Sequence, residues 1–219
     1  MVDFEHARRV MVDTQLRPGG ITDRRVLAAM GRVPREVFVP EARRELAYID
    51  DLQALDADTG PRALPAPAAL AKLLQLAEIR STDRVLDVAC GTGYSTAVVS
   101  ALGQEVVGLE PDTALADQAR EAIGLLGLGN ARIVAGWLDA LAGEEPFDVV
   151  VVGAAAGQLP QELFDLIAPG GRLVAVVQDG VASAASLHVK SASGVAAREA
   201  FNLYLPPIGE LGRAAEFVF

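Results

Sequence analysis

The sequence predicts an α/β fold with a doubly wound parallel sheet, an N-terminal helical extension and an antiparallel C-terminal edge. Three observations support this prediction. From residue 83 onward, short apolar runs alternate with segments of helical periodicity. The runs are almost continuously Val, Leu and Ile, which is typical of strands buried on both faces. A glycine-rich turn follows the first run, at the position where such sheets bind ligands.

The N-terminal third is predicted to be a helical cap. In the segment 22–30, Thr22 is placed to cap a helix whose Val26, Leu27 and Met30 share one face. The segment 50–67 contains acids, glycine and three prolines with weak periodicity, so we expect an exposed connection there. A helix is expected to begin near Pro67. The predicted division is therefore a helical cap with an acceptor-site loop over 1–66 and a main domain over 67–219, together forming one compact unit.

The main domain is predicted to contain five strands and four helices in alternation, followed by a tail of strands. Expected strands cover residues 84–89, 105–110, 131–136, 147–154 and 171–177. Helical periodicity covers 67–79, 95–102, 113–126 and 159–167. In the tail, the segments 186–191, 198–205 and 215–219 resemble strands joined by turns without intervening helices, which predicts an antiparallel edge.

Composition limits the classes of function. The 219 residues are 51% hydrophobic and carry a formal net charge of −10, so the average surface repels nucleic acids and anionic membranes. We therefore expect neither as a partner. The N-terminal residues are charged where a signal peptide is apolar, and no apolar run approaches the roughly 18 residues of a membrane span, so a cytoplasmic location is expected. The chain has one cysteine and two histidines, so no metal site is predicted.

The glycine-rich turn at residues 87–93 is the main candidate for ligand binding. Glycines at 91 and 93 allow a tight turn and a close approach of a ligand to the backbone. A simple strand-to-helix turn and an NAD site are the alternatives. Thr96 stands where the third glycine of the NAD fingerprint belongs, which disfavours NAD and hence an oxidoreductase.

The same turn resembles the Asp/Glu-x-Gly-x-Gly-x-Gly motif of class I S-adenosylmethionine (SAM) methyltransferases. Asp87, Ala89, Gly91 and Gly93 are in register with it, and Ala89 replaces the first glycine. Glu110 ends the next predicted strand, where its carboxylate would accept hydrogen bonds from both ribose hydroxyls. SAM carries an ammonium and a sulfonium and lacks a pyrophosphate, so it suits a turn lined by acids better than NAD does.

A longer string identifies a narrower family. Residues 19–40, GGITDRRVLAAMGRVPREVFVP, resemble the opening signature of protein-L-isoaspartate O-methyltransferases, and AYID, NARIVAG, PFDVVVVGAAA and LIAPGGRLVAVV extend the resemblance over nearly the whole chain. It implies a Rossmann-like SAM methyltransferase sheet with added N-terminal helices. It also implies transfer of the SAM methyl group to the free carboxylate of L-isoaspartyl residues in damaged proteins, with S-adenosyl-L-homocysteine as product.

Two segments depart from the family pattern. Gly136-Trp137-Leu138 stands where the family has glycine, acid and glycine near the adenine, so Trp137 is either an adenine contact or a core residue, and Asp139 is a candidate for the missing acid. The family's acceptor loop carries threonine and serine hydroxyls, and the alignment places Ala63 and Pro65 there. It also places Arg62 at the family's glutamine.

These substitutions leave two interpretations of the acceptor site. Arg62 is a candidate acceptor contact because its guanidinium can hold a carboxylate through two parallel hydrogen bonds. The alternative interpretation, which the sequence supports equally, is that Arg62 is an exposed loop arginine. The leading hypothesis is a SAM-dependent O-methyltransferase acting on a protein or peptide carboxylate. The alternative is a SAM-binding family member with lost or altered isoaspartyl activity, acting on another substrate or as a SAM-responsive module.

Overall fold

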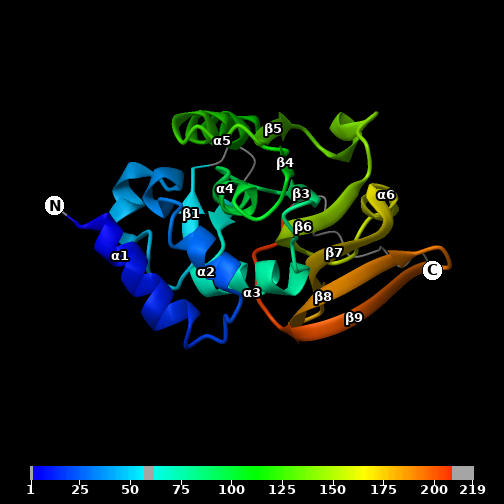
Figure 1. The fold of residues 1–219 in the computed structure, drawn as a ribbon, viewed down its shortest axis with the longest axis horizontal. Coiled ribbons are helices and arrows are strands. Elements are labelled where there is room, and N and C mark those ends of the chain that lie inside the picture. Colours follow the sequence, from blue (N-terminus) through cyan, green and yellow to red (C-terminus); the bar gives the residue numbers. More distant parts are fainter. Residues whose placement is uncertain (1, 57–61, 209–219) are drawn as a thin grey trace.

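The computed structural model describes residues 2–56 and 62–208. Its centre is a sheet whose strand order is β5-β4-β3-β6-β7-β8-β9, which Figure 1 shows running from β5 at the top to β9 at the lower right. The first five of these strands are parallel, and β8 and β9 are antiparallel to their neighbours. The strands are β3 (Arg84–Val88), β4 (Glu105–Glu110), β5 (Ala131–Ala135), β6 (Phe147–Ala156), β7 (Ile167–Asp179), β8 (Ala182–Ser191) and β9 (Gly194–Asn202).

This architecture confirms the predicted fold class. The helices that alternate with the strands are α3 (Pro67–Ala77), α4 (Tyr94–Ser100), α5 (Thr113–Leu125) and α6 (Gln161–Asp165). The hairpin of β8 and β9 forms the expected antiparallel edge, with a turn rather than a helix between its strands. The third expected tail strand, at 215–219, lies outside the described residues.

The two faces of the sheet pack against different layers. One face, which includes Val85, Val106 and Val149, packs against α3, α4, α5 and the N-terminal helices. The other face, which includes Leu86 and Val150, packs against α6 and a short 3-10 turn, η4 (Leu138–Leu141). Alternate residues of each strand thus enter opposite cores, which explains why the strand sequences are apolar at nearly every position.

The N-terminal helices share the first of these cores. They are α1 (Phe4–Met11), a π-helical turn η1 (Val12–Leu16), α2 (Arg24–Met30) and two 3-10 turns, η2 (Arg35–Phe38) and η3 (Glu41–Leu46). Their buried side chains form one contiguous cluster with those of α3, α4 and α5. In Figure 1 this region, in blue, lies at the end of the molecule opposite the β8–β9 hairpin.

The start of α2 differs from the prediction. The capping residue is Asp23, whose carboxylate accepts hydrogen bonds from the backbone N–H groups of Arg25 and Val26. Thr22 instead donates its backbone N–H to the side chain of Gln75 on α3, at 2.8 Å. Threonine and aspartate are both good capping residues, so the residue type alone does not decide between them.

The segment predicted as an exposed connection is an antiparallel hairpin of β1 (Gln53–Leu55) and β2 (Arg62–Leu64). Gln53, Leu55, Arg62 and Leu64 are all buried, so the prediction of exposure is wrong for these positions. Strands of three residues are too short to display a recognisable alternation in the sequence. The hairpin packs across the glycine turn rather than away from the domain.

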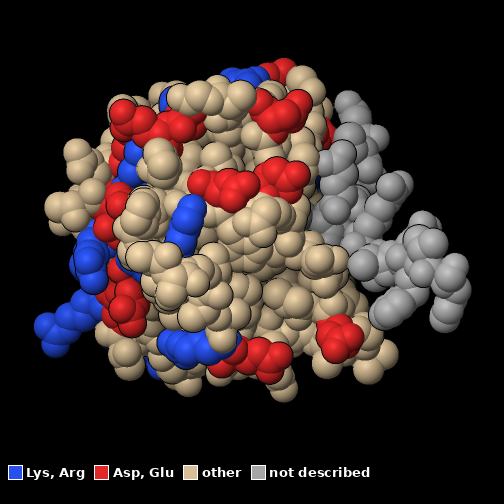
Figure 2. Space-filling model, turned by 90° about the vertical axis from the view of Figure 1, so that its right-hand side faces the viewer, with Lys and Arg blue, Asp and Glu red and all other residues tan. Residues whose placement is uncertain are grey.

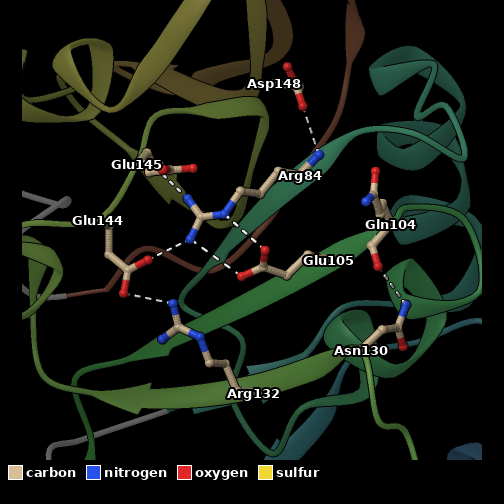
Figure 3. Close-up of polar contacts among 8 residues, drawn as sticks. All are labelled: Arg84, Gln104, Glu105, Asn130, Arg132, Glu144, Glu145 and Asp148. Carbon is tan, nitrogen blue, oxygen red and sulfur yellow. Dashed lines mark hydrogen bonds and ion pairs between the residues drawn. The ribbon is translucent and has the colours of Figure 1, made fainter.

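An ion-pair network joins the amino ends of the central strands (Figure 3). Arg84, at the start of β3, pairs with Glu105 at 3.2 Å and with Glu144 at 2.5 Å, and Glu144 also pairs with Arg132 of β5 at 2.7 Å. The Arg84 guanidinium lies 4.2 Å from the centre of the Phe147 ring. These hydrogen bonds lower the pKa of the Glu144 carboxyl below its ordinary value. The network links the amino ends of the strands, at the side of the sheet opposite the glycine turn.

The surface agrees with the acidic composition. On the face in Figure 2, acidic side chains are scattered over a mostly uncharged surface, and basic side chains lie mainly in the left half of the view. The described residues on this face form no continuous basic patch of the kind used to bind nucleic acids. Within 2–56 and 62–208, none of the helices has the length and apolarity needed to cross a membrane.

Candidate cofactor and acceptor site

The glycine-rich turn leaves the carboxyl end of β3 in the left-handed conformation that its sequence predicts. Ala89, Gly91 and Gly93 have φ angles of 61°, 59° and 90°. A Cβ added at Gly93 would lie 3.0 Å from the Cβ of Ala119 on α5, so glycine is required there by packing as well as by conformation. Ala89 adopts the same region at a cost of about 1 kcal/mol, which glycine in the related motif avoids.

Asp87 is fully buried at the end of β3, directly below the turn. Its Oδ2 accepts hydrogen bonds from Ser95 at 2.7 Å and from Thr96 at 2.6 Å, both in the first turn of α4. Its Oδ1 has no hydrogen-bond partner among the described residues. Burial raises the pKa of Asp87 to about 6, against the opposing effect of the two hydroxyl donors. A buried carboxylate oxygen without a donor is suited to receive a positively charged group.

Ser95 and Thr96 contact the candidate site residue Asp87, and the sequence analysis did not find these contacts. Thr96 entered it only as the residue that replaces a glycine of the NAD fingerprint. The available signal is a serine and a threonine in the first turn of a helix that follows a strand ending in an acid, because hydroxyls at these positions face back toward the strand end.

Glu110 is fully buried at the end of β4, one strand away from Asp87. Its Oε2 accepts the backbone N–H of Gly91 at 2.7 Å, and its Oε1 accepts the backbone N–H of Asp112 at 3.0 Å. The structure therefore brings Asp87, Gly91 and Glu110 together, as the sequence predicted. These contacts orient the Glu110 carboxylate above the turn.

Arg62 also binds this carboxylate. Its Nη1 donates to Glu110 Oε1 at 2.5 Å and its Nη2 donates to Oε2 at 2.6 Å, and the arginine side chain is only 8% exposed. The interpretation of Arg62 as an exposed loop residue is therefore wrong. Its guanidinium binds Glu110, the residue predicted to bind the ribose, and does not extend into solvent from the acceptor loop.

The β1–β2 hairpin closes the site from above. Leu55 lies 3.2 Å from where a Cβ of Gly91 would be, and Ala63 and Pro65 line a cavity of about 10 Å³ together with Asp87 and Ala89. That volume holds about one water molecule. Arg35, which is fully buried, donates its Nη2 to the Pro65 carbonyl at 2.7 Å and so holds the hairpin against the N-terminal cap.

The predicted adenine-end residues lie beside this cluster. The backbone N–H of Gly136 donates to the Glu110 carbonyl at 2.9 Å, which places the turn after β5 next to the end of β4. Trp137 is half-buried and packs on the core between the sheet and α6, in line with the core interpretation. Together with Asp139 it also lines a groove of about 570 Å³ between η4 and α6. Neither side chain contacts Asp87 or Glu110 in the interactions described.

The polar groups of the site fit SAM. Asp87 offers an unpartnered buried oxygen to a cation, and the Glu110 carboxylate is the type of acceptor that ribose hydroxyls require. The cavity of about 10 Å³ is too small for SAM, and Arg62 occupies the Glu110 carboxylate that the ribose would bind. Binding of the cofactor therefore requires the hairpin to shift. Clusters of three or more His, Cys, Asp or Glu side chains able to hold a metal are absent from the described ranges.

Known proteins resemble this chain in both sequence and fold. A family model described as protein-L-isoaspartate(D-aspartate) O-methyltransferase matches residues 6–209. A protein-L-isoaspartate O-methyltransferase 1 of Syntrophobacter fumaroxidans is 38% identical over 188 residues, covering 83% of this chain and 84% of that protein. One of Methanoculleus marisnigri is 40% identical over 173 residues, covering 78% and 76%.

Solved structures give the same fold. A protein-L-isoaspartate O-methyltransferase from Plasmodium falciparum, in complex with S-adenosyl-L-homocysteine, superposes with a TM-score of 0.80 at 23% identity and covers 93% of this chain and 98% of its own. Another structure of that name has a TM-score of 0.81 at 23% identity and covers 94% of this chain and 67% of its own.

Proposed function

The chain belongs to the protein-L-isoaspartate(D-aspartate) O-methyltransferase family, and on this basis we propose that it methylates the free carboxylate of L-isoaspartyl residues in proteins through the site around Asp87 and Glu110. It is a methyltransferase, and its cofactor is SAM. Its substrates are proteins, and we propose that it meets them in the cytoplasm. The observation that carries the assignment of the site is the pair of fully buried carboxylates on either side of the glycine turn.

We assign the cofactor contacts as follows. Glu110 accepts hydrogen bonds from the ribose hydroxyls, and its orientation is already set by the backbone N–H groups of Gly91 and Asp112. Asp87 supplies negative charge toward the positively charged end of the cofactor through its unpartnered Oδ1. Gly91, Gly93 and Gly136 supply the positive φ angles of the two turns that border the proposed cofactor site. Trp137 and Asp139 line the groove beside η4, which is the proposed adenine side.

The chemistry needs positioning more than proton transfer. Bound SAM supplies a methyl group activated by the sulfonium, and a carboxylate is already ionised at neutral pH. The chain's residues therefore have to align the acceptor carboxylate with the methyl group and exclude water. Arg62 and Ala63 lie on β2 and Pro65 directly follows it, so this strand and the residue after it are the proposed acceptor side.

Methyl transfer to an isoaspartyl peptide, measured beside its normal aspartyl counterpart, tests the proposed function. We expect labelled methyl on the isoaspartyl peptide only, and binding of S-adenosyl-L-homocysteine by calorimetry. Absence of both binding and transfer would refute the function. Binding without transfer to either peptide would leave the cofactor site standing and refute the acceptor.

A double variant tests the acceptor strand. Ala63→Thr with Pro65→Ser restores the two hydroxyls of the family pattern, while the backbone carbonyl that Arg35 holds stays in place. A hydrogen bond to a charged group contributes about 1.5 to 3 kcal/mol, so kcat/KM for the isoaspartyl peptide should rise by roughly 10-fold or more. An unchanged kcat/KM contradicts the assignment of this strand to the acceptor.

A further inference from the structure

The ion pair between Arg62 and Glu110 occupies the Glu110 carboxylate, to which the cofactor ribose is proposed to bind. Both Glu110 oxygens accept from the Arg62 guanidinium, at 2.5 and 2.6 Å, and each also accepts one backbone N–H. Four donors occupy a group that offers about four lone-pair directions. The ribose hydroxyls therefore cannot bind Glu110 while Arg62 holds it.

Separating the pair leaves two charges that need partners. Glu110 is fully buried and the Arg62 side chain is 8% exposed, so water reaches neither charge freely. A buried charge that loses its partner is strongly destabilising. Ribose hydroxyls replace Arg62 on Glu110, but nothing in the cofactor's ribose compensates the guanidinium.

The acceptor provides the missing partner. Arg62 directly precedes Ala63 on β2, and Ala63 and Pro65 line the same small cavity as Asp87, Ala89 and Gly91. Arg62 does not itself line this cavity, so its guanidinium has to leave Glu110 to reach a carboxylate bound there, which its planar pair of donors then matches. The two-point geometry that Arg62 forms with Glu110 is the geometry it would form with an acceptor carboxylate.

We propose that Arg62 exchanges carboxylates during the catalytic cycle: it binds Glu110 in the cofactor-free enzyme, is displaced by the cofactor, and then binds the carboxylate of the acceptor. This inference rests on the proposed function and adds an order to it. The cofactor binds first and creates the anion site that the isoaspartyl carboxylate fills. Because the coupling between two ligands is reciprocal, the acceptor also strengthens binding of the cofactor.

The exchange has opposite consequences for the two ligands. Arg62 competes with the cofactor for Glu110. Only molecules in which the pair is open can bind the cofactor, so the measured affinity is reduced in proportion to the fraction of open molecules. Removing the guanidinium removes the competitor and also removes the acceptor's partner. A residue with a purely structural role would weaken both ligands or neither.

Calorimetry with S-adenosyl-L-homocysteine tests the first half. We expect Arg62→Ala to bind it at least about 10-fold more tightly than the wild type does. Arg62→Gln, which supplies the family's residue, should behave similarly, and Arg62→Lys should fall between because it keeps the charge without the paired donors. Unfolding by urea establishes that each variant is folded, and the Gln and Lys variants carry the test if the Ala variant is not.

Arg172→Ala is the matched control. Arg172 is also a largely buried arginine paired with an acid, Asp83, at 2.8 Å, and it lies outside the cofactor site. Its loss should lower the stability of the protein and leave the affinity for S-adenosyl-L-homocysteine unchanged. A tighter complex in this variant as well would assign the Arg62 effect to general loosening of the fold and overturn the exchange.

Binding of an isoaspartyl peptide tests the second half. The wild type should bind it at least about 10-fold more tightly in the presence of S-adenosyl-L-homocysteine, and Arg62→Ala should lose this dependence. Equal peptide affinity with and without the cofactor product, or weaker cofactor binding by Arg62→Ala, overturns the proposal. These outcomes differ from failure of the proposed function, in which the wild type itself binds no cofactor product or methylates no isoaspartyl peptide.

Discussion

Replacing Asp87 by asparagine should change how the stability of the protein depends on pH. Asparagine keeps the size of the side chain and an amide oxygen that can accept the hydrogen bonds of Ser95 and Thr96. It removes the ionisable group. The comparison between wild type and Asp87→Asn therefore isolates the titration of this one carboxyl.

The size of the effect follows from the pKa. Burial raises the pKa of Asp87 to about 6 in the folded protein, whereas an aspartate in an unfolded chain has a pKa of about 3.9. The folded state therefore binds more protons than the unfolded state between these values, so stability falls as pH rises through this window. A shift of about 2 units corresponds to about 3 kcal/mol. The contribution is fully present below about pH 4 and is lost above about pH 6.

Urea unfolding of both proteins between pH 4 and 7.5 measures this difference. The free energy of unfolding of the wild type, relative to Asp87→Asn, should decrease by about 3 kcal/mol across the range. Other titrating groups affect both proteins alike and cancel. A flat difference, or a wild type that gains relative stability as pH rises, would refute the reasoning that Asp87 is buried with one oxygen unpartnered.

Three further changes test the packing of the fold. Gly93→Ala should lower the free energy of unfolding by about 1 to 3 kcal/mol in urea, because φ is 90° there and the new Cβ lies 3.0 Å from Ala119; equal stability would show that the turn relaxes. Gly124→Ala, in α5 with nothing within 4 Å of the new Cβ, should instead raise it by about 0.4 to 1 kcal/mol. Arg84→Ala should lower stability through loss of the strand-edge ion pairs while calorimetry finds cofactor-product affinity unchanged, and a changed affinity would link that edge to the site.

The sheet and the cofactor half of the site were predictable from the sequence for a common reason. Each parallel strand is buried on both faces, so its sequence is apolar throughout and its ends are easily recognised. Asp87 and Glu110 are the acids at two such ends, and parallel strands bring their carboxyl ends to one edge of the sheet. Periodicity and topology therefore predicted that the two strand ends lie together, and the resemblance to the methyltransferase motif singled out the two carboxylates.

The acceptor half depends on contacts that local sequence does not encode. Arg62 and Glu110 are 48 residues apart, and the three-residue strands of the hairpin carry too little pattern to predict burial. Tertiary contacts decide these features, so a motif search finds the residues without finding their partners.

The charge on Arg62 has a consequence for catalysis that the family's hydroxyls do not share. The acceptor carboxylate loses its negative charge as the methyl ester forms, so a guanidinium holds the ground state more strongly than the transition state. Arg62 should therefore favour binding of the acceptor while adding little to the rate of transfer. Arg62→Gln should accordingly raise KM for the isoaspartyl peptide and leave kcat equal or higher. A fall in kcat at unchanged KM would contradict this expectation. It would mean that Arg62 stabilises the transition state by aligning the acceptor carboxylate with the methyl group.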